Sequence, residues 1–258
     1  MINFFKMKRN LLFLLIMFIH LISAQTDSLQ LIGKPDADSA VYLFKYQKLL
    51  VPSVFIGYGI LSLTSDGLKQ LNTSTKHEIN EHQPDKIKLD NYTQFAPAAA
   101  VYGLNAFGIK GKHSLKDRSI ILGTSLLISS AVVLPTKHLV KEDRPDGSNN
   151  LSFPSGHTAF AFATAQFMFR EYQEDHFWLS LAGYPFAVFT GIYRTLNDKH
   201  WVGDVVAGAG IGILSTEAAY WLFPKISKIF HKPNSQNTAF VYPFYQSKTI
   251  GLGMSFNF

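Results

Sequence analysis

Two long cationic side chains stand at the end of an apolar stretch, and a proline closes the segment. Lys137 follows the apolar residues, and Arg144 comes seven positions later, directly before Pro145, which stops any helix. Arginine offers a planar fork of donors and lysine a compact charge, so the two can clamp a phosphate if they converge. Basic residues at a helix carboxyl end also complement the helix dipole, so this segment alone leaves both interpretations open.

A Pro-Ser-Gly-His sequence follows at residues 154–157 and runs into another apolar stretch. Pro154 fits the first turn of a helix, and Gly156 lets the backbone approach a ligand closely. The free N–H groups at a helix start form an anion site, and His157 on the first turn can pass a proton to a leaving oxygen. An ordinary capped helix with an incidental histidine would have the same sequence.

The third group of reactive residues is Arg194, His200 and Asp204. His200 and Asp204 are four positions apart, so on a helix they would share one face. A carboxylate bonded to one ring nitrogen fixes the tautomer and leaves the other nitrogen free to attack. Taken alone, the pair could also be a surface contact or part of a metal site, although the strong cations of the three segments oppose a divalent ion.

In this order, the three segments resemble the motifs of the type 2 phosphatidic acid phosphatase and vanadium haloperoxidase superfamily. The resemblance covers roughly residues 95–223, with motifs at 137–145, 154–157 and 194–204. One departure is Tyr193, because the family usually has serine before the arginine of the third motif. The change removes a small hydroxyl near the phosphate and leaves the charged residues intact.

The resemblance implies a role for each motif residue. His200 would be the nucleophile that forms a phosphohistidine, Asp204 would orient it, and His157 would protonate the leaving alcohol and then activate water. Because three fixed cations could replace the usual Mg²⁺, no metal or other cofactor is expected. The phosphate oxygens would be bound by Lys137, Arg144, Arg194, Ser155 and the backbone N–H of Gly156.

The elements that must position these residues have the lengths of helices. Six apolar stretches are each longer than a typical strand of ~5–6 residues, and several are rich in Ala and Gly, which suits close helix contact. We therefore predict an all-α bundle of about six helices, with a loop or surface helix over the polar residues Ser65–Asn91. The stretches are Leu49–Leu63, Phe95–Ile109, Ser119–Leu134, His157–Phe169, Trp178–Tyr193 and Val205–Phe223.

Charge distribution favours a membrane-embedded bundle. Ser119–Leu134 and Val205–Phe223 are nearly free of charge. Most stretches are shorter than the ~20 residues of a membrane span, which keeps a soluble periplasmic bundle open. Segment 110–118 carries four basic residues against one acid, so the positive-inside rule places it in the cytoplasm and residues 137–157 in the periplasm.

Residues 1–24 have the layout of a secretory signal peptide, with an uncleaved membrane anchor as the alternative. Basic residues precede the apolar core Leu11–Ile22, and Ser23 and Ala24 supply a small-residue cleavage site. A cleaved signal also places residue 25 outside the cytoplasm. The two topology signals agree only if Leu49–Leu63 does not cross the membrane or lies along its interface.

The carboxyl end differs from the rest of the chain. Apolar residues alternate with Gly, Ser and Asn over Thr249–Phe258, which predicts a strand, and Ala239–Tyr245 could pair with it as a hairpin. The predicted organisation is a signal peptide (1–24), an N-terminal segment with one apolar helix and a polar loop (25–92), a phosphatase helical domain (93–224) and a tail with the hairpin (225–258).

Composition excludes several classes of protein. Cysteine is absent, which excludes disulfide frameworks, thiolate zinc sites and cysteine nucleophiles. The net charge is +6, but no dense Lys/Arg block is present, so nucleic acid is not an expected partner.

The combined prediction is a metal-independent phosphatase in the bacterial inner membrane, with its site facing the periplasm. The substrate would be a phosphomonoester or diphosphate group of an envelope lipid: phosphatidic acid, phosphatidylglycerol phosphate, undecaprenyl diphosphate or lipid A. The main alternative is a soluble periplasmic acid phosphatase of broad specificity. A vanadium-dependent haloperoxidase and a non-catalytic envelope protein also remain open.

Overall fold

A computed structural model describes residues 46–82, 86, 88–230, 238–246 and 249–257 of the chain. The predicted signal segment 1–24 lies outside the described residues. Two compact units are present, residues 1–221 and 222–258. The helices are α2 (Gln47–Thr64), α3 (Asp66–His82), α4 (Asp90–Thr93), α5 (Ala96–Ala106), α6 (Leu115–Val140), α7 (Gly156–Tyr172), α8 (Phe177–Ser180), α9 (Gly183–Leu196) and α10 (Val202–Phe230), and the strands are β1 (Thr238–Gln246) and β2 (Thr249–Asn257).

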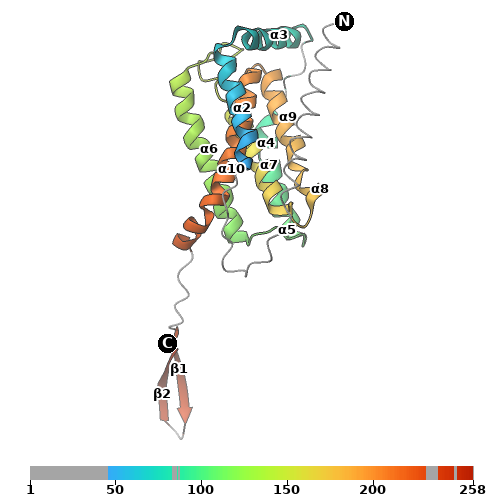
Figure 1. The fold of residues 1–258 in the computed structure, drawn as a ribbon. Coiled ribbons are helices and arrows are strands. Elements are labelled where there is room, and N and C mark those ends of the chain that lie inside the picture. The colour runs from blue at the N-terminus through green and yellow to red at the C-terminus, as the bar shows by residue number, and fades with distance from the viewer. Residues whose placement is uncertain (1–45, 83–85, 87, 231–237, 247–248, 258) are drawn as a thin grey trace. The chain divides into compact units, whose positions relative to one another are not determined.

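The predicted helical bundle is confirmed (Figure 1). Five of the six apolar stretches correspond to one helix each, and the polar stretch after α2 contains the surface helix α3. The stretch Trp178–Tyr193 was predicted as one helix, but it is divided between α8 and α9. The break falls just before Gly183. A Cβ atom at this position would lie 3.1 Å from the Ala165 Cα, so the lack of a side chain lets α9 approach α7.

The central helix is α7, and almost all of it is buried. Its small residues pack against α9 and α10, as in the apolar cluster that joins Ala161, Ala187 and Ala209. A Cβ atom on Gly212 of α10 would lie 2.1 Å from the carbonyl oxygen of Ala159, so only glycine permits this approach. Small residues therefore set the helix spacing that brings the three motifs together.

Among the described residues, three helices are long and apolar enough to cross a bilayer: α2 with 18 residues, α6 with 26 and α10 with 29. Only 17% of the apolar window of α2 and 22% of that of α6 are buried. Val54, Ile60, Leu127 and Leu134 on these helices are each more than half exposed. Exposed apolar faces of this kind are stable against lipid, and the prediction of a membrane-embedded bundle is confirmed.

The direction of the three long helices defines two ends of the bundle. Helices α2 and α6 run toward one end, and α10 starts there and runs back (Figure 1). Ser62, near the end of α2, lies against Gly203 at the start of α10, and Lys48 pairs with Glu217 at 3.5 Å. The first apolar helix therefore lies along α10, and not across the end of the bundle.

The C-terminal unit contains the predicted hairpin. Strands β1 and β2 are antiparallel, with Thr238 opposite Asn257 and Gln246 opposite Thr249. Strand β1 extends the prediction by one residue at each end. Strand β2 begins at Thr249 as predicted and runs to Asn257, and the predicted last residue, Phe258, lies outside the described residues.

Candidate active site

The first motif lies at the C-terminal end of α6. This is the end of the bundle at which α2 also terminates. Lys137 is in the last turn of α6, and Lys141 ends the helix with a φ of 53°. The Lys137 ammonium donates to the carbonyl oxygens of Leu151 (2.7 Å) and Ser152 (3.0 Å). These bonds hold the loop before the second motif and leave one of the three ammonium donors for a ligand.

The second motif begins α7, but the helix starts at Gly156, two residues after Pro154. Ser155 is the N-cap and accepts a hydrogen bond from the Thr158 N–H, so Pro154 precedes the helix and is not in its first turn. The Ser155 N–H donates to the carbonyl oxygen of Asp204 (3.0 Å), which ties this motif to the third. At Gly156 the nearest atom is the Val133 Cγ1, 3.5 Å from a built Cβ, so protein packing does not demand a glycine there.

The third motif spans the junction of α9 and α10. Arg194 is in the last turn of α9, and the N–H groups of Lys199 and His200 both donate to its carbonyl oxygen. His200 precedes α10, so the prediction that it shares a helix face with Asp204 is wrong. The contact nevertheless forms, because the tight turn places the His200 Nδ1 3.4 Å from the Asp204 Oδ2.

The Asp204 carboxylate is the most heavily bonded group of the site. Its Oδ2 accepts hydrogen bonds from the Ser152 hydroxyl and from the Trp201 N–H (2.9 Å). The Glu142 carboxyl also bonds to it, and burial together with this bond raises the pKa of Glu142 to about 9. At neutral pH Glu142 is therefore protonated and donates to Asp204, which itself is 1% exposed.

The cations of the three motifs are close enough to influence both histidines. Burial, opposed by the nearby Asp204 carboxylate and reinforced by Lys137 and Arg194, lowers the pKa of His200 to about 4. Burial and Arg194 lower the pKa of His157 to about 4 as well. Both rings are therefore neutral at pH 7, the form in which an imidazole nitrogen can attack or accept a proton.

Two of these cations have donors without partners among the described residues. The Nε atoms of Arg144 and Arg194 are buried and make no hydrogen bond there. A buried guanidinium donor without a partner costs free energy, which is acceptable where a ligand anion supplies the acceptor. These two donors are therefore available to a ligand anion.

Four residues of this centre were missed by the sequence pattern: Asp90, Asn91, Glu142 and Ser152. Asp90 in α4 accepts from the Arg194 Nη1 (2.9 Å), and Asn91 accepts from the Nε2 of His157 (2.9 Å). They lie 66 or more residues from their partners, so no local spacing points to them. Of these four residues, Glu142 alone could have been suspected from the sequence, because it is an acidic residue inside the first motif.

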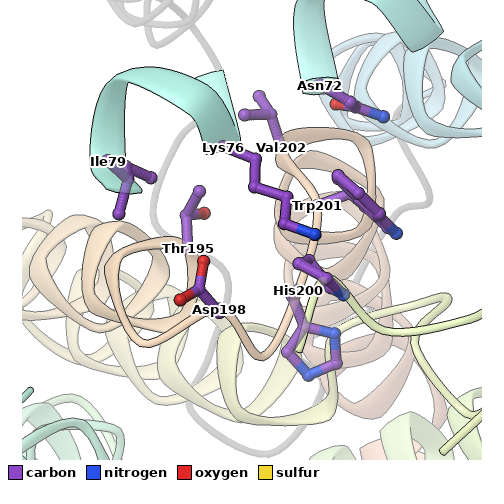
Figure 2. Close-up of a pocket in the computed structure, with 9 residues that line it drawn as sticks. Asn72, Lys76, Ile79, Thr195, Asp198, His200, Trp201 and Val202 are labelled. Atoms are coloured by element: carbon purple, nitrogen blue, oxygen red, sulfur yellow. The ribbon is translucent and has the colours of Figure 1, made fainter. Parts of the chain in front are cut away.

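Helix α3 covers one side of His200. A small pocket is lined by His200, Trp201, Thr195 and Asp198 from below and by Asn72, Lys76 and Ile79 of α3 from above (Figure 2). The Lys76 ammonium lies 5.7 Å from the centre of the Trp201 ring. Tyr193, the residue that departs from the family pattern, packs its ring on Phe189, 4.3 Å away between ring centres.

Comparison with known proteins identifies the region that carries these motifs. Residues 118–228 match the profile of the PAP2 superfamily, and they contain all three motifs. This segment belongs to the PAP2 superfamily. The remainder of the site, including α3 and α4, comes from the chain before the PAP2 segment.

Three curated bacterial proteins are similar to this chain. The chain is 39% identical over 153 residues to Lipid A 1-phosphatase of Porphyromonas gingivalis, covering 58% of this chain and 33% of that one. It is 40% identical over 79 residues to the bacitracin transport permease protein BcrC of Bacillus licheniformis (30% and 36%). It is 34% identical over 73 residues to Lipid A 1-phosphatase of Helicobacter pylori (28% and 36%). The chain therefore spans about a third of the length of the curated relatives it matches.

Two solved structures are similar. The transmembrane PAP2 type phosphatidylglycerolphosphate phosphatase from Bacillus subtilis superposes with a TM-score of 0.51 at 19% identity, covering 71% of this chain and 99% of that one. Aquifex aeolicus LpxE superposes with a TM-score of 0.45 at 21% identity, covering 58% and 94%. The Bacillus structure shows that the two proteins share a fold.

Proposed function

We propose that the protein is a phosphatase that hydrolyses phosphate groups of envelope lipids. The observation that carries the proposal is the meeting of the Lys137, Arg144 and Arg194 side chains around the His200–Asp204 pair. Free guanidinium donors bind phosphate oxygens, and a neutral imidazole held by a carboxylate is a nucleophile.

The chemistry proceeds in two steps. The bound phosphate favours the protonated ring of His157, which acts as the acid. The His200 Nε2 attacks phosphorus, the bond from phosphorus to the lipid oxygen breaks, and the His157 imidazolium gives that oxygen a proton and becomes neutral. Water then attacks the phosphohistidine, His157 takes the proton of the water, and phosphate leaves with the His200 nitrogen restored. In both steps the negative charge of the phosphate is stabilised by Lys137, Arg144 and Arg194, with Ser155 and the Gly156 N–H as further donors. The proposed reaction therefore requires no metal ion.

A membrane lipid is the substrate class that the surroundings favour. The exposed apolar faces of α2 and α6 place the acyl chains of a lipid beside the protein, with its phosphate at the end of the bundle where the site lies. The matched relatives named lipid A 1-phosphatase support the phosphorylated sugar of lipid A as the first candidate. A soluble acid phosphatase is not favoured, because it would leave those faces in water.

We also propose that the site faces the periplasm. The basic segment 110–118 precedes and begins α6, and Lys137 lies near its other end, ~33 Å away at 1.5 Å per residue. The positive-inside rule therefore puts the site outside the cytoplasm. The same geometry puts Gln47 at the cytoplasmic end, which disagrees with a cleaved signal peptide that leaves residue 25 outside.

Single cysteines test the orientation, because the chain has none of its own. Ser148→Cys in the loop of the site end should react with a membrane-impermeant maleimide in spheroplasts, and Lys110→Cys should react only after lysis. The reverse pattern would place the site in the cytoplasm and favour the cleaved signal.

Hydrolysis is tested with purified protein in detergent and EDTA. Phosphate release from lipid A, short-chain phosphatidic acid, phosphatidylglycerol phosphate and undecaprenyl diphosphate is compared for the wild type and His200→Ala. Release that the substitution abolishes supports the proposal. Activity that survives in His200→Ala, or that EDTA removes and Mg²⁺ restores, contradicts it.

A further inference from the structure

The short helix α4 reaches two of the three motifs. Its first residue, Asp90, is 1% exposed and accepts hydrogen bonds from the Arg194 Nη1 (2.9 Å) and the Asn197 Nδ2 (3.4 Å). The next residue, Asn91, accepts from the His157 Nε2 (2.9 Å). All of these partners lie within the PAP2 segment, whereas α4 lies before it.

The bond from His157 to Asn91 decides which ring nitrogen carries the proton. An asparagine Oδ1 can only accept, so the Nε2 of His157 must be the donor. In the neutral ring the remaining nitrogen, Nδ1, is then unprotonated, and it is the atom through which His157 can exchange a proton with a reacting group. Without an acceptor at Nε2, either nitrogen could hold the hydrogen and the ring could rotate.

We infer that Asn91 is a positioning residue that fixes the tautomer and ring orientation of His157 for proton transfer. The inference rests on the proposed function, since it assigns a purpose to the proton that His157 exchanges. Asn91 itself does not touch the reacting atoms; it acts only through His157.

The surroundings of Asn91 separate this role from a purely structural one. Its side chain is exposed, and the amide of Gln94 donates to its backbone oxygen, a bond that any side chain at position 91 would keep. Replacement of the side chain should therefore leave α4 in place. Neighbouring Tyr92 is 75% exposed and supplies a matched control on the same helix.

Asn91→Ala should lower kcat for lipid phosphate hydrolysis about 10-fold, a part of the 10²- to 10⁴-fold that general acid catalysis supplies, with KM changed less than 2-fold. Tyr92→Ala should match the wild type. In a His157→Ala background, Asn91→Ala should lower kcat by less than a further 2-fold, because the side chain that Asn91 positions is already absent. An equal loss in both backgrounds would overturn the inference.

Asn91→Asp provides a second readout that a structural role would not move. A carboxylate at position 91 joins the charged groups that face His157, which are Asp90 on α4, Arg194 on α9, Arg144 in the loop and Lys137 on α6. The added negative charge favours the protonated ring, so the limb of the kcat–pH profile that belongs to His157 should move about 1 pH unit upward. An unmoved profile in a folded Asn91→Asp protein would count against the inference.

Nitrogen-15 NMR of histidine-labelled protein tests the tautomer without activity. The His157 signal, identified by its loss in His157→Ala, should show a hydrogen on Nε2 in the wild type and a mixture of tautomers in Asn91→Ala. Unchanged signals together with normal hydrolysis by Asn91→Ala would refute the positioning role and leave the proposed function standing. The expected signals in a protein that does not hydrolyse lipid phosphates would support the positioning role and refute the proposed function.

Discussion

Helix α7 has a buried group of charges at each end, and the two differ in how the charges are paired. At its start lie the cations of the three motifs. At its end, Glu171 accepts hydrogen bonds from the His113 Nδ1 (2.7 Å) and the Tyr220 hydroxyl (2.7 Å) and pairs with the Arg118 Nε at 3.7 Å. The residue before Glu171 also forms an ion pair, because the Arg170 Nη1 donates to Glu217 at 2.8 Å. We call this second group the Glu171 cluster.

The comparison shows what separates a binding site from a structural centre in one fold. In the Glu171 cluster each carboxylate has a fixed basic partner, so the charges are balanced within the protein. At the start of α7, Lys137 donates only to backbone carbonyls, and Arg144 makes no side-chain hydrogen bond or ion pair with the described residues. Unbalanced positive charge has a free-energy cost that a bound anion removes, so it indicates function.

Arg144→Ala should show the largest effect on catalysis with no cost to stability. The loss of a guanidinium from the phosphate site should lower kcat/KM about 10³-fold, as for other fixed donors at developing charge. The positive charges of Arg194 and Arg144 repel each other. Removal of Arg144 should therefore leave the free energy of unfolding unchanged or raise it. Phosphate release and thermal unfolding in detergent measure the two quantities, and Arg144→Lys should be intermediate in activity. A destabilised Arg144→Ala would show that the motif cations are structural.

Glu171→Gln should do the opposite. Removal of a charge from a buried ion pair leaves Arg118 without compensation, so the free energy of unfolding should fall by about 3 kcal/mol. The folded fraction should keep kcat within 2-fold of the wild type, because the substitution is a helix length away from His200. Unfolding curves and active-site-normalised rates test both statements. A large loss of kcat in folded protein would mean that the two ends of α7 are coupled.

Glu142 tests whether a protonated carboxyl belongs to the site. Because burial raises its pKa to about 9, it donates to Asp204 at neutral pH, and the amide in Glu142→Gln can donate in the same way. Glu142→Gln should therefore keep most of the wild-type kcat, whereas Glu142→Ala should lose about 10-fold through a less well held Asp204. Equal losses in the two variants would mean that Glu142 is ionised.

The pH profile follows from the low pKa of His200. The ring is the nucleophile only when neutral, so activity is present above its pKa and lost as the pH falls through it. With a folded pKa of about 4, the acid limb of kcat/KM should lie well below the usual 6.5 of histidine. Phosphate release measured from pH 3.5 to 8 would show where this limb lies. A limb near 6.5 would indicate that His200 is solvated in the working enzyme.

The sequence placed the three motifs at helix ends, where the structure has them, but it did not indicate the residues that support them. The structure brings Lys137, Ser155, Arg194 and Asp204 together, and their roles stay a prediction. Local rules misplaced Pro154 and the His200 turn by a residue or two, since cap geometry depends on contacts such as the bond from Ser155 to Asp204. Asp90 and Asn91 could not be found, because their partners are distant in the chain and the segment around them is merely polar.

Substitution of Lys76 should show the smallest effect, and it tests whether α3 belongs to the site that the three motifs form at the start of α7. The Lys76 ammonium shares a pocket with His200, so it would add to the field that attracts a phosphate without holding it (Figure 2). Lys76→Ala should raise KM about 3-fold at low salt and leave kcat unchanged, and the difference should vanish at 0.5 M salt because screening shortens the reach of the charge. Lys116→Ala, at the opposite end of α6, should leave KM unchanged. A fall in kcat for Lys76→Ala would instead mean that α3 takes part in arranging the His200 ring, and α3 would then be part of the site at the start of α7.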